Sequence, residues 1–244
     1  MCNLYVPPEP DEIRLYFGVQ IPLDLPYDVR NVAPMKNGPY VKAHGAAAVG
    51  QWALIPSNSV GRVPKRADGK KMSTNNLRTE NIGKLRTVLG PVWKRGQRCL
   101  IPAWSYDEPY WGHKEDGSDK ERNIWWRFRR KDGTPWALAG VWNDWIEKSS
   151  GEIVPSYSML TMGANSHRLL KLMHRPERYP DGSVKPLLEQ DKRSVVPIER
   201  ADWDAWLHGT PEQAQTLVRL PAFDLFDHGA ANPAQQVELP LETV

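Results

Sequence analysis

Short strand-like segments separated by turn sequences restrict the fold of this chain more than any other feature. Residues 123–130 and 135–145 are rich in aromatic and β-branched side chains, and the Asp132-Gly133 pair between them is typical of a tight hairpin turn. Further short strands are predicted at 46–55, 98–103, 157–162 and 192–198. Strands do not alternate with long helices, which argues against a parallel βαβ architecture. We therefore expect an α+β fold, with mixed, mainly antiparallel sheets curved into a barrel-like core and with peripheral helices.

Short helices are predicted around this core at 9–16, 83–90, 166–173 and 201–207. Ser166 is a suitable N-cap for the third helix. His174 follows the last turn of that helix, where the helix dipole favours the charged imidazolium. A lone histidine at such a place is more often a C-terminal cap than a catalyst.

The charge distribution suggests one domain with a tail. We expect a domain over 1–210, with a charged, proline-interrupted insertion at about 175–191, and an acidic tail over 211–244. The tail holds five carboxylates against Arg219 and is predicted to be irregular. Since the whole chain has a net charge of +3, its body is moderately basic. Such a body can hold a polyanion, and exposed members of its 11 tryptophans could stack on unpaired bases.

Composition also excludes several classes of protein. No run of about 18 apolar residues is present, so no membrane span is expected. The first residues lack the basic and apolar parts of a secretory signal. Cys2 and Cys99 alone cannot form a disulfide framework, which fits a reducing cytoplasm, and neither has the spacing of a metal site. Cys99 is expected to be an inert core thiol.

The Met1-Cys2 pair offers distinctive chemistry. Removal of Met1 would leave Cys2 with a thiol and a free α-amine on adjacent carbons. An α-amine has a pKa near ~7.7, against ~10.4 for lysine, so it is far more reactive at neutral pH. It can condense with an aldehyde to an imine, on which the thiol can close to a thiazolidine. Cys2 could instead act as the thiolate of an N-terminal-nucleophile hydrolase, or be an incidental residue at a frayed end.

Two further segments carry candidate site residues. In an extended strand Asn76, Arg78 and Glu80 would share one face, which suggests a site, although a salt-bridged strand edge is the alternative. Glu108 follows a buried strand among aromatic residues, where burial readily raises a carboxyl pKa for acid/base work, although a plain loop carboxylate would also fit.

An ordered series of short motifs runs through most of the chain. It comprises Met1-Cys2, Asn76-x-Arg78-x-Glu80, 98–103 followed by Glu108, 139–142 (Ala-Gly-Val-Trp) and Met173-His174-Arg175, with 31–34 and 51–56 in addition. The series spans roughly residues 1–207 and resembles the SOS response-associated peptidase (SRAP) family. The resemblance implies that the chain senses abasic sites in single-stranded DNA and captures them as a thiazolidine on Cys2, after removing its own Met1.

The resemblance also implies individual roles. Cys2 would be the nucleophile, and Asn76 would orient the sugar or the α-amine. Glu108 and His174 would transfer protons. Arg78, and less strongly Arg86, would bind phosphates, with Asn76 also near the DNA. Neither metal nor cofactor is implied, and we expect a monomer in the cytoplasm, associated with the nucleoid.

The sequence departs from the family pattern in three places. Asn3-Leu4 replaces the usual Gly-Arg after the cysteine, so one phosphate contact is lost or supplied elsewhere. The segment around Glu108 is altered, which leaves Asp107 as an alternative acid/base. The insertion displaces the run that usually follows His174, with 193–196 as its counterpart, and leaves His167 as the fallback histidine.

Two other functions remain compatible with the sequence. One is a cysteine hydrolase or peptidase that acts on other proteins or amides. The other is a non-covalent single-stranded DNA-binding module that uses tryptophans and the basic residues between Arg62 and Lys71.

Overall fold

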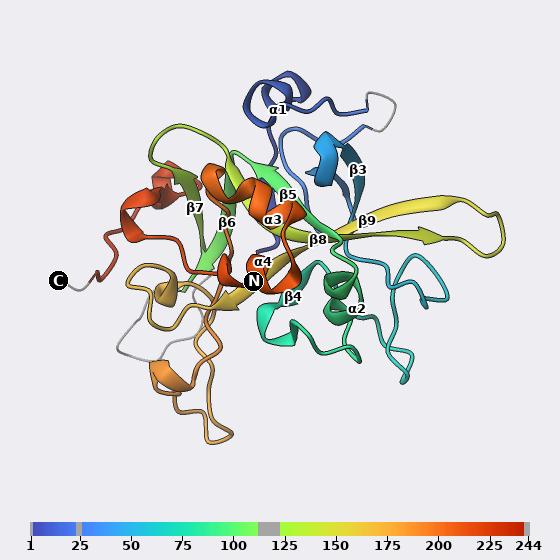
Figure 1. The fold of residues 1–244 in the computed structure, drawn as a ribbon. Helices are drawn as coiled ribbons and strands as arrows, with labels where there is room; N and C mark the ends of the chain where they lie inside the picture. Colours follow the sequence, from blue (N-terminus) through green and yellow to red (C-terminus); the bar gives the residue numbers. More distant parts are fainter. Residues whose placement is uncertain (1, 23–25, 112–122, 242–244) are drawn as a thin grey trace.

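The fold consists of a barrel and a second sheet packed against it (Figure 1). The computed structural model describes residues 2–22, 26–111 and 123–241. Met1 and the polar turn expected at 112–121 lie outside these residues. The α+β class with barrel-like antiparallel sheets is confirmed, because nearly all strand pairs are antiparallel and the helices are short and peripheral.

Five strands of the described chain close into the barrel. Its strands are β2 (Asn37–Val41), β3 (Ala47–Trp52), β5 (Arg98–Ala103), β8 (Trp136–Ile146) and β9 (Ile153–Gly163). β3 pairs with β2, β2 with β5, β5 with β8 and β8 with β9, all antiparallel. The parallel pairing of β9 with β3 completes the ring. β4 (Asn76–Arg78) and β10 (Arg193–Val195) lie along further stretches of β9.

The second sheet has the order β1-β6-β7-β11. Its strands are β1 (Leu4–Val6), β6 (Ser105–Tyr110), β7 (Ile124–Arg130) and β11 (Phe226–Ala230), and all the pairs are antiparallel. The start and the late part of the chain therefore lie in one sheet, on either side of β6 and β7.

The predicted hairpin over 123–145 is wrong, although both of its strands exist. β7 pairs with β6 and β11, whereas β8 pairs with β5 and β9, so the turn between them carries the chain from one sheet to the other. Phe128 and Trp136 both point into the core between the sheets, and Trp136 Nε1 donates to the Phe128 carbonyl (3.4 Å). Both strands obtain their ladder hydrogen bonds from other partners while the two rings stay buried.

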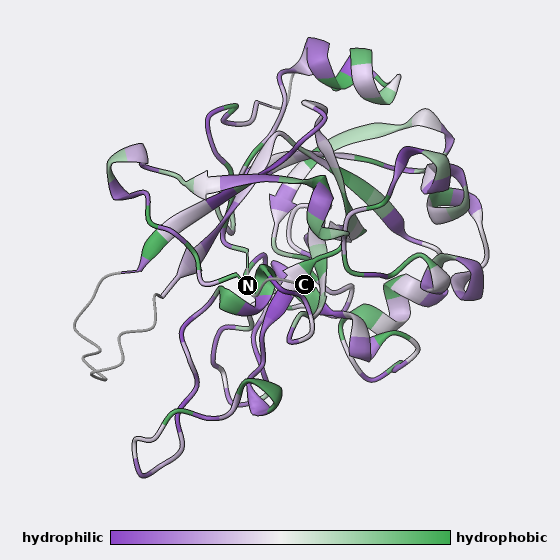
Figure 2. Ribbon diagram, turned by 90° about the vertical axis from the view of Figure 1, so that its left-hand side faces the viewer, coloured by the Kyte–Doolittle hydropathy of each residue, from purple (hydrophilic) through white to green (hydrophobic). Residues whose placement is uncertain are grey.

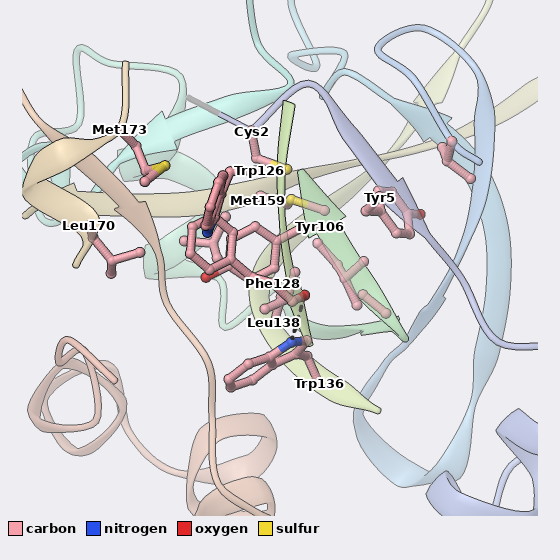
Figure 3. Packing of buried hydrophobic residues seen from close by; sticks show 14 of the residues in the cluster. Cys2, Tyr5, Tyr106, Trp126, Phe128, Trp136, Leu138, Met159, Leu170 and Met173 are labelled. Atoms are coloured by element: carbon pink, nitrogen blue, oxygen red, sulfur yellow. Dashed lines mark hydrogen bonds between the residues drawn. The ribbon is translucent and has the colours of Figure 1, made fainter. Parts of the chain in front are cut away.

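Buried aromatic side chains fill the space between barrel and sheet (Figure 3). Cys2 lies in this cluster and is fully buried, as is Cys99, and Trp52, Trp126 and Trp136 belong to the same cluster. Gly140 of β8 shows how tightly the barrel packs. A Cβ on it would lie 2.8 Å from Cys99 Sγ and 2.9 Å from the Ser158 carbonyl oxygen. The expectation that Cys99 is a core thiol is confirmed.

The helices are short and lie outside the sheets. They are α1 (Pro10–Phe17), α2 (Leu89–Lys94), α3 (Trp203–His208) and α4 (Pro211–Thr216). In α1 the Glu12 carboxylate accepts from Glu9 N–H (2.8 Å), and Gly18 ends the helix in the left-handed region. Hydrophilic and hydrophobic residues both occur along α1 at the top of the molecule, as expected for a surface helix (Figure 2). Short 3₁₀ helices span Ala43–Gly45, Thr79–Asn81, Leu170–Leu172, Leu187–Glu189, Arg200–Asp202, Phe223–Leu225 and Pro233–Gln235.

Two predicted helices are absent from the described chain. Residues 83–88 form turns, and α2 begins only at Leu89 because the Thr87 hydroxyl accepts from Gly90 N–H (3.2 Å) at its start. Residues 166–173 form turns with one 3₁₀ helix instead of an α-helix. There His167 Nδ1 accepts from Leu169 N–H (3.2 Å) and Leu170 N–H (3.1 Å), which holds the segment in a turn.

The expectation of an irregular chain beyond Pro211 is also wrong. Residues 211–216 form α4, which Thr210 caps, and β11 pairs with β7 over its whole length. Phe226 at the start of β11 packs against Phe128 and Trp136. Acidic charge did not prevent this segment from joining the fold, and its Ala214 and Phe226 are buried. No helix in the described ranges is long and apolar enough to cross a membrane.

Candidate active site

The site forms where two segments meet along one edge of β6. β1 pairs with residues 105–107 of β6, with Leu4 opposite Asp107. On the same edge, opposite β7, His174 N–H donates to the Pro109 carbonyl (2.7 Å) and Met173 bridges Tyr110. Cys2, two residues before β1 begins, therefore approaches His174 next to Glu108. The strand pairing alone brings the first, middle and later parts of the chain together.

Asn76 ties the start of the chain to the barrel. Parallel pairing of β4 with β9 places Asn76 opposite Met159, and the side chain is 6% exposed. Its Nδ2 donates to the Cys2 carbonyl (2.6 Å), while its buried Oδ1 has no hydrogen-bond partner in the described structure. A buried unpaired acceptor is costly, so this oxygen is available to a donor on Cys2 or on a bound ligand.

Buried Glu108 and partly buried His174 form a pair beside Cys2. His174 Nε2 donates to Glu108 Oε2 (2.8 Å), and the Glu108 side chain is only 2% exposed. Burial raises the pKa of Glu108, but the charges of His174 and of the chain's amino terminus, with the hydrogen bonds from both, outweigh burial, so the pKa lies below its usual value. The raised pKa expected from burial alone is therefore wrong, and Glu108 is a carboxylate at neutral pH. It is suited to accept protons.

The Cys2 thiol is neutral at rest. Burial raises its pKa well above the usual value, and the Glu108 charge adds to the effect. Sγ donates to the Leu4 carbonyl (3.4 Å). A thiol of this kind is a weak nucleophile unless a base takes its proton as it reacts, and Glu108 is close enough to influence its titration.

The His174 backbone is held in an unusual conformation. Its φ is +65°, in the left-handed region that non-glycine residues rarely adopt. Lys192 Nζ donates to the carbonyls of Met173 (2.7 Å) and His174 (2.9 Å). Burial lowers the pKa of Lys192 to about 8. These contacts fix His174 against β6, so its position rests on the segment after the insertion and not on a helix end.

Arg78 and Glu80 do not share one role. β4 ends at Arg78, and Glu80 lies in the following 3₁₀ helix. The Arg78 guanidinium is half-exposed and hydrogen-bonds Asp191. Glu80 accepts from both terminal nitrogens of the buried Arg193 (2.6 and 2.9 Å). The single polar face expected from period two is therefore wrong beyond Arg78, and both of these side chains take part in ion pairs at the edge of the site.

Comparison with protein families gives a match over almost the whole chain. The profile of the family "SOS response associated peptidase (SRAP)" matches residues 1–228. The chain belongs to this family. Membership supports a role in the response to DNA damage and to abasic sites, and with it DNA binding.

Three solved structures resemble the chain over nearly its whole length. The chain is similar to a protein of Bordetella bronchiseptica, with a TM-score of 0.75, 26% identity, and coverage of 98% of this chain and 100% of that one. A Bacteroides thetaiotaomicron protein gives a TM-score of 0.71 at 16% identity, with coverage of 94% and 91%. A phage-related protein of B. bronchiseptica gives 0.61 at 14% identity, with coverage of 95% and 94%. The latter two show the fold alone. No curated protein matches the chain significantly.

Asp107 and His167, the alternatives to Glu108 and His174 in the SRAP motifs, bind structural partners instead. Asp107 is 3% exposed and accepts two hydrogen bonds from Arg127 (2.8 Å each), on the face of β6 opposite to that of Glu108. His167 hydrogen-bonds the Pro221 carbonyl (3.0 Å) besides capping its own turn. These contacts favour Glu108 and His174 as the pair beside Cys2.

Arg86 lies in a different place from the Cys2 site. It lines a cavity of about 1170 Å³ between residues 56–72 and 85–95. The same cavity is lined by further basic side chains, namely Lys65, Arg66, Lys71 and Arg95. No tryptophan is among the lining residues within the described chain, and neither is any member of the Cys2 site. The base-stacking groove that a non-covalent binding module would need is not formed there.

Sequence reasoning missed the side chains that support the site. Tyr5 of β1 shares a buried hydrogen bond with Tyr157 of β9 (2.5 Å), and a Cβ on Gly38 would lie 2.2 Å from both hydroxyls. Asp191 and Lys192 contact Arg78 and His174 from the end of the insertion. The charged run at 191–193 could have indicated these supporting residues, but nothing in the neighbouring sequence indicated which side chains they would bind. Among the described residues no group of three His, Cys, Asp or Glu side chains is arranged to hold a metal ion.

Proposed function

We propose that this SRAP chain captures abasic sites in single-stranded DNA as a covalent thiazolidine on Cys2, after self-removal of Met1. The observation that carries the proposal is the convergence of Asn76 and of the Glu108–His174 pair on Cys2, from four separate parts of the chain. Family membership gives the damage context.

The chemistry proceeds in two balanced steps. The free α-amine of Cys2 attacks the aldehyde of the ring-opened deoxyribose, a C–N bond forms, and water leaves to give an imine. The thiol then adds across the C=N bond, so that sulfur bonds to carbon and a proton ends on nitrogen. The adduct has the summed mass of protein and DNA less one water, and neither step consumes an oxidant or a reductant.

Each neighbouring side chain has a role in these steps. The Glu108 carboxylate takes the thiol proton during ring closure, which the high thiol pKa of Cys2 requires. His174 passes protons to the leaving water and to the sugar hydroxyl. Asn76 Oδ1, which has no partner in the described structure, orients the α-amine. Arg78 binds the flanking phosphate.

Intact mass spectrometry and denaturing gels test the proposal. Processed protein should lack Met1 and should form a denaturation-resistant adduct with an oligonucleotide that carries one abasic site. Cys2→Ala should abolish the adduct, whereas Cys99→Ala, which alters the other buried cysteine, should retain it. Peptide turnover without any adduct would overturn the proposal in favour of a peptidase, and equal DNA retention by Cys2→Ala would favour a non-covalent binding module.

A further inference from the structure

Four charged groups alternate in sign at the edge of the Cys2 site. Arg78 hydrogen-bonds Asp191 Oδ2, and the other oxygen of Asp191 lies 3.6 Å from Arg193 Nη1. Arg193 in turn binds Glu80 through both terminal nitrogens and donates to the Thr161 carbonyl (2.6 Å). Asp191 therefore lies between two guanidinium groups.

The two arginines differ in what they can still bind. The Arg193 side chain is 4% exposed and is held by Glu80 and Thr161, so it serves the structure. The Arg78 side chain is 48% exposed, and within the described ranges Asp191 is the carboxylate that contacts it. A carboxylate on an exposed guanidinium occupies the same donor positions that a phosphate would use.

We propose that Asp191 is an internal competitor that occupies the phosphodiester-binding face of Arg78 and so sets the affinity for undamaged single-stranded DNA. This inference rests on the proposed function, in which Arg78 binds a flanking phosphate. A phosphate must displace Asp191, which can then rely on Arg193 as its remaining partner. Competition with Asp191 lowers the affinity of Arg78 for the phosphate, so an intact strand dissociates. An abasic strand is retained by its covalent bond to Cys2.

Asp191 comes from the proline-interrupted insertion, which extends away from the body of the molecule (orange in Figure 1). The next two residues, Lys192 and Arg193, bind the His174 backbone and Glu80. Asp191 is therefore held in place by its neighbours rather than by its own contact with Arg78. Loss of its charge should leave the site intact.

Fluorescence anisotropy with an undamaged oligonucleotide tests the competition. Asp191→Asn keeps the side-chain shape and removes the charge, and should tighten binding roughly two- to fivefold, as expected for a partly exposed ion pair. The slope of log K against log salt should become steeper by up to about 0.7. In the wild type, Asp191 takes up a cation when phosphate displaces it from Arg78, and this uptake offsets a cation released from the DNA. Asp191→Asn removes the uptake. Asp181→Asn is the matched control, since it makes the same charge change in the same insertion and contacts Ser183 instead of Arg78.

A double variant identifies the route of the effect. In an Arg78→Gln background, Asp191→Asn should give no gain. The inference is overturned if Asp191→Asn and Asp181→Asn change the affinity equally, or if the gain persists without Arg78. Thermal unfolding of each variant excludes misfolding as a cause.

Failure of this inference and failure of the proposed function give different results. If wild type forms the Cys2 adduct but Asp191→Asn binds intact DNA no better, only the inference fails. If no variant forms an adduct with the abasic oligonucleotide, the proposed function fails whatever the anisotropy shows.

Discussion

Glu108 illustrates how neighbouring charges decide the chemistry of a buried residue. Its sequence context predicts burial, and burial alone would keep the carboxyl neutral. The structure adds His174 at 2.8 Å, and its charge, together with that of the chain's amino terminus, reverses the direction of the pKa shift. The charged form is retained in a buried site because a hydrogen bond to a charged group contributes about 1.5–3 kcal/mol. The residue is thus suited to act as a base, whereas the raised pKa expected from the sequence left its acid or base role open.

Acid unfolding should reveal the Glu108 pair. The folded-state pKa lies below the ordinary value of 4.5, so the unfolded chain binds a proton more readily. The stability that Glu108 contributes is therefore fully present above about pH 4.5 and is lost as the pH falls through the folded value. Glu108→Gln lacks this titration. Its free energy of unfolding, from urea titrations between pH 6 and 3, should fall less steeply than that of wild type, and parallel curves would contradict the assignment.

The same substitution should slow capture without preventing DNA binding. Loss of a proton acceptor that acts in the reaction typically costs about 10²–10⁴-fold in rate. The rate of adduct formation measured on gels should therefore fall by about this factor in Glu108→Gln. Asp107→Asn is unsuitable as a control, because Asp107 anchors Arg127 in the same strand.

At the scale of elements, strand positions were easier to predict than strand partners. β7 and β8 occur within a residue or two of the expected segments, yet they lie in different sheets. The Asp132-Gly133 turn fits a hairpin, but β7 pairs with β6 and β8 pairs with β9. Turn chemistry is local, whereas the choice between pairing and crossing depends on where Phe128 and Trp136 can be buried.

The barrel wall offers a test of packing. Gly140→Ala places a methyl group against Cys99 and the Ser158 backbone, and overpacking of this kind destabilises by about 1–3 kcal/mol. Gly163→Ala in the neighbouring β9 meets nothing within 4 Å, so its effect should stay within about 0.5 kcal/mol. Chemical denaturation of both variants measures the difference. Equal stabilities would show that the contact at Gly140 is relieved by small movements.

The second sheet unites the early and the late part of the chain, which lie at its two edges. β1 and β11 lie in one sheet although they are separated by most of the sequence, and Phe226 completes the aromatic core. The late segment is therefore part of the fold that positions Cys2, because β7 joins β11 to β6.

Truncation should make this dependence visible. A chain that ends at residue 222 loses β11 and exposes Phe128 and Trp136. Burial of each large aromatic ring contributes about 1.5–3 kcal/mol, so Tm should fall by roughly 10 °C or more. Phe226→Ala in the full chain should account for only part of the loss, which separates the side chain from the strand. A truncated chain that unfolds within about 2 °C of wild type would mean that the segment is a dispensable tail.

The sequence by itself determined the fold class, the strand segments, the chemistry of Cys2 and the identity of Asn76, Glu108 and His174 as candidates. These follow from local patterns, from composition and from motifs that keep their order along the chain. Only the tertiary structure decided which strands pair, which carboxylate faces His174 and what holds Arg78. Those outcomes depend on groups far apart in sequence, such as Cys2 with Asn76 or Arg78 with Asp191, and burial and charge act between such groups only after the barrel has closed.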